Sequence, residues 1–206
     1  MTHISPLPAS PLPDGIHPLP SGKLAAVVTY LEMFARPDPR DVAVPEGVTL
    51  VAYEAADLAW YRGLYRAVGE DWLWFSRLYM EDAALAAILH HKDVEVYALR
   101  KDGRDLGLLE LDVRDPDNTE LAFFGLSKEL IGTGAGRWMM ERALDLAFKR
   151  PITRLFVHTC TLDSPQAVGF YIRSGFVPYG RAIEVMDDPR MNGPVRGDAA
   201  GHIPKI

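Results

Sequence analysis

The chain has 206 residues, of which 48% are hydrophobic and 24% are charged, a balance typical of a soluble globular protein rather than a disordered, collagenous or membrane-spanning one. Its 22 basic residues are outnumbered by 28 acidic ones, which gives a net charge of -6 and argues against a nucleic acid partner. The single cysteine, Cys160, excludes an internal disulfide framework, and the sequence has no Cys/His cluster with the spacing of a metal site.

Proline-rich stretches surround an apolar island near the N-terminus. Nine of the sixteen prolines precede residue 46, and residues 22–34 between them are rich in β-branched and apolar side chains. Because proline favours extended connectors, we expect residues 1–47 to form an extension with one strand, at the edge of a sheet, which leaves a homodimer through that edge open. The N-terminus lacks a secretory signal and no apolar run reaches membrane-spanning length, so we expect a cytoplasmic protein without a membrane partner.

From Val48 onward the hydrophobic pattern changes between strand and helix periods. The expected elements are, in chain order, a strand at 48–53, helices at 55–68 and 82–90, strands at 94–100, 106–113 and 120–126, a helix at 137–150, a strand at 154–159, a helix at 165–174 and a strand at 183–186. This order predicts an α/β (α+β) fold over residues 48–206, with a mixed, mostly antiparallel central sheet and helices on both faces. The late strand-helix-strand unit should be parallel and leave room for a ligand at its glycine-rich crossover.

That crossover, residues 131–137, contains three glycines at alternate positions before a long helix. Such a loop lets backbone N–H groups approach an anion, and the helix dipole favours negative charge there, so the loop predicts a phosphate site. A Walker A loop would need Lys-Ser or Lys-Thr where Arg137 and Trp138 stand. A dinucleotide fingerprint would need a third glycine at Arg137 and an acidic residue at the end of the next strand, which ends Phe156-Val-His158. A third kind is a pyrophosphate loop for coenzyme A, which the following resemblance favours.

Two motifs resemble those of the GNAT superfamily of acyl-CoA-dependent N-acyltransferases. The first is the strand at 121–126 followed by Gly134 and Gly136, with Ile131 where the family usually has Arg or Gln. The second has Ser164 where the family often has Asn, and its further matching positions are Ala167, Tyr171, Gly175 and Phe176. In this order and spacing the motifs make the chain similar to the superfamily from about Val48 to Met186.

The resemblance implies an N-acetyltransferase that moves an acyl group, most simply acetyl, from acetyl-CoA to an amine acceptor by direct attack in a ternary complex, without a metal. The acceptor would be a small molecule or a peptide. The implied cofactor-binding residues are Leu126, Ile131, Gly132, Thr133, Gly134, Ala135, Gly136, Arg137 and Ser164. Tyr171 would lie near the coenzyme A sulfur and give a proton to, or hydrogen-bond, the departing thiolate. A non-catalytic acyl-CoA sensor on the same fold is the alternative, and a nucleotide-binding oxidoreductase is a weaker one.

Glu120, at the start of its strand, is the expected base for the acceptor ammonium, with Glu110 and Asp112 on the neighbouring strand as rivals. Ser164 before Pro165 also has the pattern of a helix N-cap. We expect Cys160 to be a small apolar side chain rather than a nucleophile, and the adjacent histidines at 90–91 to be a solvated helix end. An aromatic wall beside two carboxylates would suit a cationic or ring-bearing amine or simply pack the core; its residues are Glu70, Asp71, Trp72, Trp74, Phe75 and Tyr79.

Overall fold

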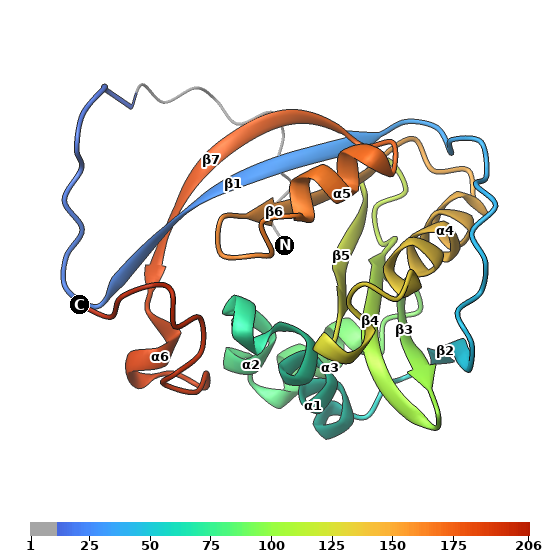
Figure 1. Ribbon diagram of the computed structural model, residues 1–206, viewed down its shortest axis with the longest axis horizontal. Helices are drawn as coiled ribbons and strands as arrows, with labels where there is room; N and C mark the ends of the chain where they lie inside the picture. Colours follow the sequence, from blue (N-terminus) through green and yellow to red (C-terminus); the bar gives the residue numbers. More distant parts are fainter. Residues whose placement is uncertain (1–11) are drawn as a thin grey trace.

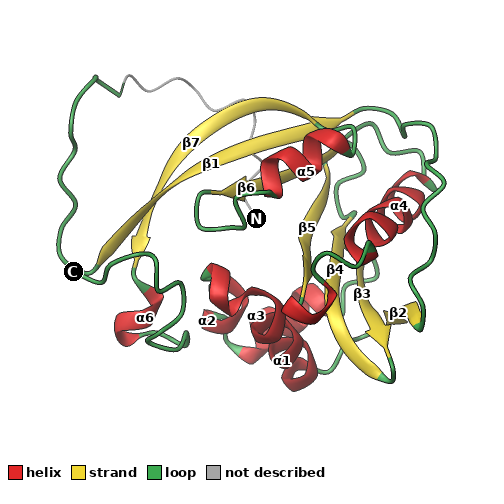
Figure 2. Ribbon diagram, in the orientation of Figure 1, coloured by secondary structure: helices red, strands yellow, loops and turns green. Residues whose placement is uncertain are grey.

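The computed structural model describes residues 12–206, and within this range seven strands form a single open sheet (Figures 1 and 2). The strands are β1 (Lys23–Met33), β2 (Val48–Tyr53), β3 (Val94–Lys101), β4 (Arg104–Asp112), β5 (Thr119–Leu126), β6 (Leu155–Cys160) and β7 (Val177–Asp187). The helices are α1 (Leu58–Gly69), α2 (Ser76–Tyr79), α3 (Asp82–Leu89), α4 (Ala135–Phe148), α5 (Ala167–Arg173) and α6 (Pro189–Asn192), with 3-10 turns η1 (Glu70–Trp72) and η2 (Lys128–Leu130). None of the helices in residues 12–206 is both long and apolar enough to cross a membrane.

The strand order is β2-β3-β4-β5-β6-β1-β7, and each neighbouring pair is antiparallel except β5 and β6. The predicted α/β class, with a mixed, mostly antiparallel sheet, is therefore confirmed. The parallel pair is short, because only Thr119 and Glu120 of β5 are in register with β6. Beyond Glu120 the two strands run apart (Figure 1), which leaves one edge of β5 without a neighbouring strand.

A bulge in β5 lies next to this divergence. Leu111 of β4 pairs with Leu121 and Glu110 pairs with Phe123, so Ala122 is an extra residue on β5. Leu121 and Phe123 would share a face in a regular strand, but the extra residue sends them to opposite faces. Leu121 accordingly packs in the core of one face and Phe123 against the core of the other.

The two faces of the sheet have separate cores. Met139, Met140 and Leu144 of α4 share one core with Tyr171 of α5, and helices α1 and α3 build the other. A third cluster lies at the far end of β1, where the C-terminal residues pack; its buried members are Leu24, Ala26, Leu73, Leu162, Val195, Ala199 and Ala200.

The strand expected at 22–34 is present as β1, but its expected place at the sheet edge is wrong. β1 pairs with β7 from Lys23 to Glu32 and with β6 from Val28 to Met33, so it lies inside the sheet. The sheet edge next to β1 is formed by β7, which begins at Val177 rather than at residue 183. Pro178 conceals the start of β7 in the sequence, and a proline is tolerated there because an edge strand needs fewer main-chain donors. The extended connector expected for residues 1–20 lies partly outside the described residues 12–206.

Candidate active site

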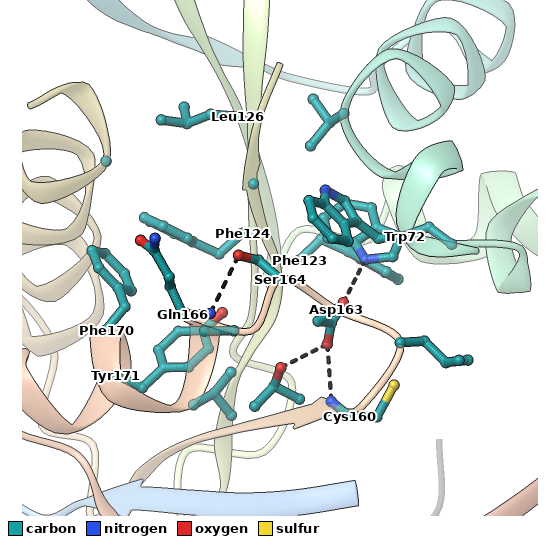
Figure 3. Close-up of a pocket in the computed structure, with 18 of the residues that line it drawn as sticks. Trp72, Phe123, Phe124, Leu126, Cys160, Asp163, Ser164, Gln166, Phe170 and Tyr171 are labelled. Carbon is teal, nitrogen blue, oxygen red and sulfur yellow. Dashed lines mark hydrogen bonds between the residues drawn. The ribbon is translucent and has the colours of Figure 1, made fainter. Parts of the chain in front are cut away.

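A cavity of about 620 Å³ lies where β5 and β6 diverge. Its lining includes Phe124 and Tyr171, which belong to the core under α4 and α5, and also Phe123 and Trp74, which pack in the core under α1. Figure 3 shows Phe124 and Tyr171 on one side of β5 and Phe123 on the other. The cavity therefore connects the two faces of the sheet through the gap that the short parallel pairing leaves.

The glycine-rich loop forms one end of the cavity, with Ile131, Gly132, Gly134, Gly136 and Arg137 in its lining. Gly132 and Gly134 have φ values of +83° and +88°, a region that L side chains rarely adopt. Gly134 is the N-cap of α4 and has no side chain to cap the helix. As a result, the main-chain N–H groups of Gly136 and Arg137 have no hydrogen-bond partner among residues 12–206.

Two guanidinium groups line the cavity, Arg137 in the glycine-rich loop and Arg173 at the end of α5. Within the described chain, neither forms an ion pair with a carboxylate. Free N–H groups at the start of a 14-residue helix and two unpaired guanidinium groups in the same cavity are suited to bind an anion. No sequence motif includes Arg173, so its place in the cavity becomes visible only from the packing of α5.

Two of the expected loop residues support the loop rather than line the main cavity. The Thr133 hydroxyl donates to the Leu130 carbonyl at 2.8 Å and accepts from the Ala135 N–H at 3.4 Å. Thr133 faces a neighbouring cavity of about 260 Å³, together with residues 41–45. Ala135 is fully buried and can offer only its main chain.

Ser164 lines the cavity, but the expectation that it is a helix N-cap is wrong. Helix α5 begins at Ala167 and its N-cap is Gln166. The Ser164 hydroxyl instead accepts the Gln166 N–H at 3.4 Å, in a turn that precedes the helix. The helix starts later than Pro165 because the Ala167 N–H bonds the Ser164 carbonyl and closes that turn first.

Tyr171 reaches the cavity from α5. Its ring packs edge-on against Phe124, Phe170 and Phe176 and is only 7% exposed, so its position is fixed. Its hydroxyl has no hydrogen-bond partner among residues 12–206. Burial, with a smaller effect of the Asp163 charge, raises the pKa of Tyr171 well above its ordinary value. The phenol therefore keeps its proton at neutral pH and can donate a hydrogen bond into the cavity.

Glu120 does not line the cavity, and His158 lies between its carboxylate and the cavity. The two side chains meet at the end of the β5–β6 pairing, where Glu120 pairs with Phe156, and Glu120 Oε1 lies 3.2 Å from His158 Nδ1. His158 is 47% exposed and lines the cavity, whereas Glu120 is nearly buried. Burial lowers the pKa of His158, but the hydrogen bond and charge of Glu120 outweigh this and raise it. Sequence reasoning missed His158 because a single strand histidine carries no motif.

The two rival carboxylates are engaged elsewhere. Glu110 is fully buried and accepts hydrogen bonds from the Tyr61 hydroxyl and the Arg77 guanidinium. Burial raises the pKa of Glu110 despite the opposing charge of Arg77. Asp112 is bound by Arg114 through two nitrogens. Neither carboxylate lines the cavity, so neither can meet a ligand in it.

The aromatic wall is present, but the two carboxylates expected beside it do not line the cavity. Trp72, Trp74 and Phe75 line the cavity, while Tyr79 lies outside. The carboxylates of Glu70 and Asp71 are paired with basic side chains, namely Arg66, Lys128 and Arg196. Glu184 of β7 lines the same cavity, and in the described residues it has no ion-pair partner.

Cys160 also lines the cavity, and burial together with Asp163 raises its pKa to about 11. The thiol is therefore protonated at neutral pH and is a poor nucleophile. His90 and His91 contact main-chain atoms, the carbonyl of Ala56 and the N–H of Asp93. Among residues 12–206, no three His, Cys, Asp or Glu side chains are grouped so as to hold a metal ion.

The sequence model of the Acetyltransferase (GNAT) family matches residues 58–176, more than half of the chain. No curated protein sequence matches significantly. One similar solved structure is a GCN5-related N-acetyltransferase from Sphaerobacter thermophilus, with a TM-score of 0.58 and 11% identity over 79% of this chain and 52% of that one. Another is a GCN5-related N-acetyltransferase from Kribbella flavida, with a TM-score of 0.51 and 20% identity over 82% of this chain and 60% of that one.

A third similar structure is an aminoglycoside acetyltransferase from an uncultured soil metagenomic sample, with a TM-score of 0.51 and 13% identity over 62% of this chain and 87% of that one. The chain thus spans little more than half of the Sphaerobacter and Kribbella proteins. At these identities the likeness establishes the fold.

Proposed function

Because the chain belongs to the acetyltransferase (GNAT) family, we propose that it is an N-acetyltransferase that transfers an acetyl group from acetyl-CoA to an amine by direct attack in a ternary complex. The observation that carries the proposal is the cavity through the sheet, with an anion site on one face and an aromatic, acidic wall on the other. A donor and an acceptor that enter from opposite faces would meet at the gap between β5 and β6.

The residues at the loop end of the cavity fit the phosphates of coenzyme A. The free N–H groups of Gly136 and Arg137 and the unpaired guanidinium groups of Arg137 and Arg173 supply both directional donors and positive charge. Acetyl-CoA, when bound, supplies an acyl group already activated as a thioester. The edge of β5 that β6 leaves unpaired offers main-chain N–H and C=O groups from Leu121 to Leu126 to the rest of the donor.

The opposite side of the cavity fits an amine acceptor. Glu184 offers a carboxylate to an ammonium group, and Trp72 and Trp74 offer ring faces suited to a cation or an apolar stem. We propose that the acceptor is a small-molecule or peptide amine that enters between these groups.

The chemistry asks little of the side chains beyond orientation and proton transfer. The amine nitrogen forms a bond to the acyl carbon as the carbon–sulfur bond breaks, and main-chain donors of β5 would stabilise the negative charge on the acyl oxygen. Tyr171, which its raised pKa keeps protonated, would hydrogen-bond the departing sulfur and relay to it the proton that the amine nitrogen releases as the amide forms.

Tyr171→Phe tests this role. The variant should lower kcat by about 100-fold, the scale of a lost general acid, and leave the Kd of acetyl-CoA unchanged because the ring and its packing remain. The measurement is free-thiol release from acetyl-CoA in the presence of a panel of primary alkylamines, with binding followed by calorimetry. Tyr97→Phe is the matched control, because Tyr97 loses a hydrogen bond to Glu95 outside the cavity.

An unchanged kcat in Tyr171→Phe would contradict the role of Tyr171. Acetyl-CoA binding by the wild-type protein without thiol release for any amine would instead favour a non-catalytic acyl-CoA sensor on this fold.

A further inference from the structure

We propose that His158 accepts the proton of the acceptor ammonium and that Glu120 is the positioning residue that orients its ring. The inference rests on the proposed N-acetyltransferase function and concerns the acceptor half of the same cavity. An ammonium group cannot attack a thioester until it loses a proton, so a base must lie in the cavity within reach of the acceptor.

The geometry selects His158 among the basic groups of the cavity. Its Nδ1 faces Glu120 Oε1 at 3.2 Å, which fixes the ring plane and favours the tautomer with the proton on Nδ1. Nε2 is then the nitrogen that can take a proton, and the half-exposed ring lines the cavity on the strand next to the gap.

Strand alternation places His158 on the acceptor side of the sheet. Val157 packs in the core under α4 and α5, and Cys160, two residues from His158, packs on the other face beside Met186. His158 therefore lies on the face opposite to Tyr171, with the gap between β5 and β6 separating them. A proton acceptor for the amine and a proton donor for the sulfur on opposite faces match a donor and an acceptor that meet in the gap.

Other titratable side chains of this part of the cavity are less suited to the task. The Asp163 carboxylate already accepts three hydrogen bonds, from Trp74 Nε1, Thr159 Oγ1 and the Cys160 N–H (Figure 3). The Cys160 thiol is protonated at neutral pH. Glu184 is exposed and lacks a partner that would hold it in one orientation, in the residues described.

Nε2 of His158 takes one proton from the ammonium group and passes it to water, to which the half-exposed ring has access. The neutral nitrogen attacks the acyl carbon, and the carbon–sulfur bond breaks. The second proton, released from nitrogen as the amide forms, replaces the one that Tyr171 gives to sulfur. The net reaction converts an ammonium ion and a thioester into an amide, a thiol and one proton.

The groups that face His158 give the proposal a pH signature. They are Glu120 on β5, Tyr30 on β1, Glu184 on β7, Asp163 after β6 and Cys160 on β6. The carboxylates among them favour the imidazolium form, so the transfer rate should rise with pH as His158 loses its proton. Removing the Glu120 charge should move this rise to lower pH and weaken the base.

The test is the pH profile of kcat/KM for acetyl transfer to the best acceptor in a panel of primary alkylamines, for wild type, His158→Gln, Glu120→Gln and Glu120→Asp. His158→Gln should lose about 100-fold in kcat/KM and the acidic limb of the profile. Glu120→Gln should lose less and shift that limb to lower pH, and Glu120→Asp should recover part of the loss. His91→Gln is the control, because His91 lies at the end of α3 away from the cavity.

If His158→Gln keeps the wild-type kcat/KM and the acidic limb of its pH profile, this proposal is overturned and the proposed function stays intact. A wild-type protein that transfers acetyl to no amine would overturn both. If His158→Gln does not fold, Glu120→Gln decides: an NMR titration of the His158 ring should show a lowered pKa together with the shifted rate profile, and a profile that stays in place would overturn the proposal.

Discussion

Gly134 shows how one residue sets both the loop geometry and the predicted ligand chemistry. It caps α4 at φ +88°, and an added Cβ would meet only Arg137 Nη2, at 3.8 Å. Gly134→Ala has room for its methyl group but not a favourable backbone. We expect it to lower the free energy of unfolding by about 1 kcal/mol and to weaken acetyl-CoA binding, because the loop must relax and redirect its N–H groups.

Gly103→Ala is the matched control for this prediction. Gly103 has φ +77°, meets no atom within 4 Å and lies in the β3–β4 turn away from the cavity. Gly103→Ala should lower the free energy of unfolding, measured with urea, by a similar amount and leave the Kd for acetyl-CoA unchanged. Equal affinities in the two variants would show that the loop conformation does not serve acetyl-CoA binding.

Between elements, the buried pair of Arg77 and Glu110 joins α2 to β4. Both side chains are fully buried, Tyr61 of α1 adds a hydrogen bond, and Arg77 also lies 5.0 Å over the Phe123 ring. Glu110→Gln leaves a buried guanidinium without its counter-charge and should lower the free energy of unfolding by about 3–5 kcal/mol. Arg77→Met should cost a comparable amount for the same reason.

The double variant with Arg77→Met and Glu110→Gln distinguishes the pair from simple packing. Since it leaves no unpaired charge, it should cost less in urea unfolding than the sum of the two single changes. Additive losses would show that the two charges do not depend on each other.

The strands also show what a sequence can and cannot predict. Alternation in β1 is strong, with Leu24, Ala26, Val28 and Tyr30 buried on one face, so its existence as a strand follows from local pattern. The position of β1 in the sheet does not follow from local pattern, because β1 pairs with a strand far along the chain, with Val28 opposite Cys160. The start of β7 was missed for the same reason, since pairing with β1 overrides the local signal of Pro178 and Gly180.

In the whole molecule, the candidate site also has a part that local sequence predicts and a part that depends on tertiary packing. The loop end was predictable because glycine spacing and the start of α4 are local features of residues 131–137. The roles of His158 and Arg173 could not be predicted from the sequence, because their place in the cavity depends on the divergence of β5 and β6 and on the packing of α5. The C-terminal segment also depends on tertiary contacts. Arg190 donates hydrogen bonds to the carbonyls of Ala199, Ala200 and Ile203, and these hold the third hydrophobic cluster beside the acceptor side of the cavity.

The most direct test of the account is calorimetric titration of the full chain with acetyl-CoA, for wild type and for a variant with Arg137→Gln and Arg173→Gln. We expect saturable one-to-one binding to the wild type and clearly weaker binding to the variant, since both guanidinium groups would face the phosphates. Absence of binding to a folded wild-type protein, or equal affinity in the variant, would contradict the assignment of this cavity to coenzyme A.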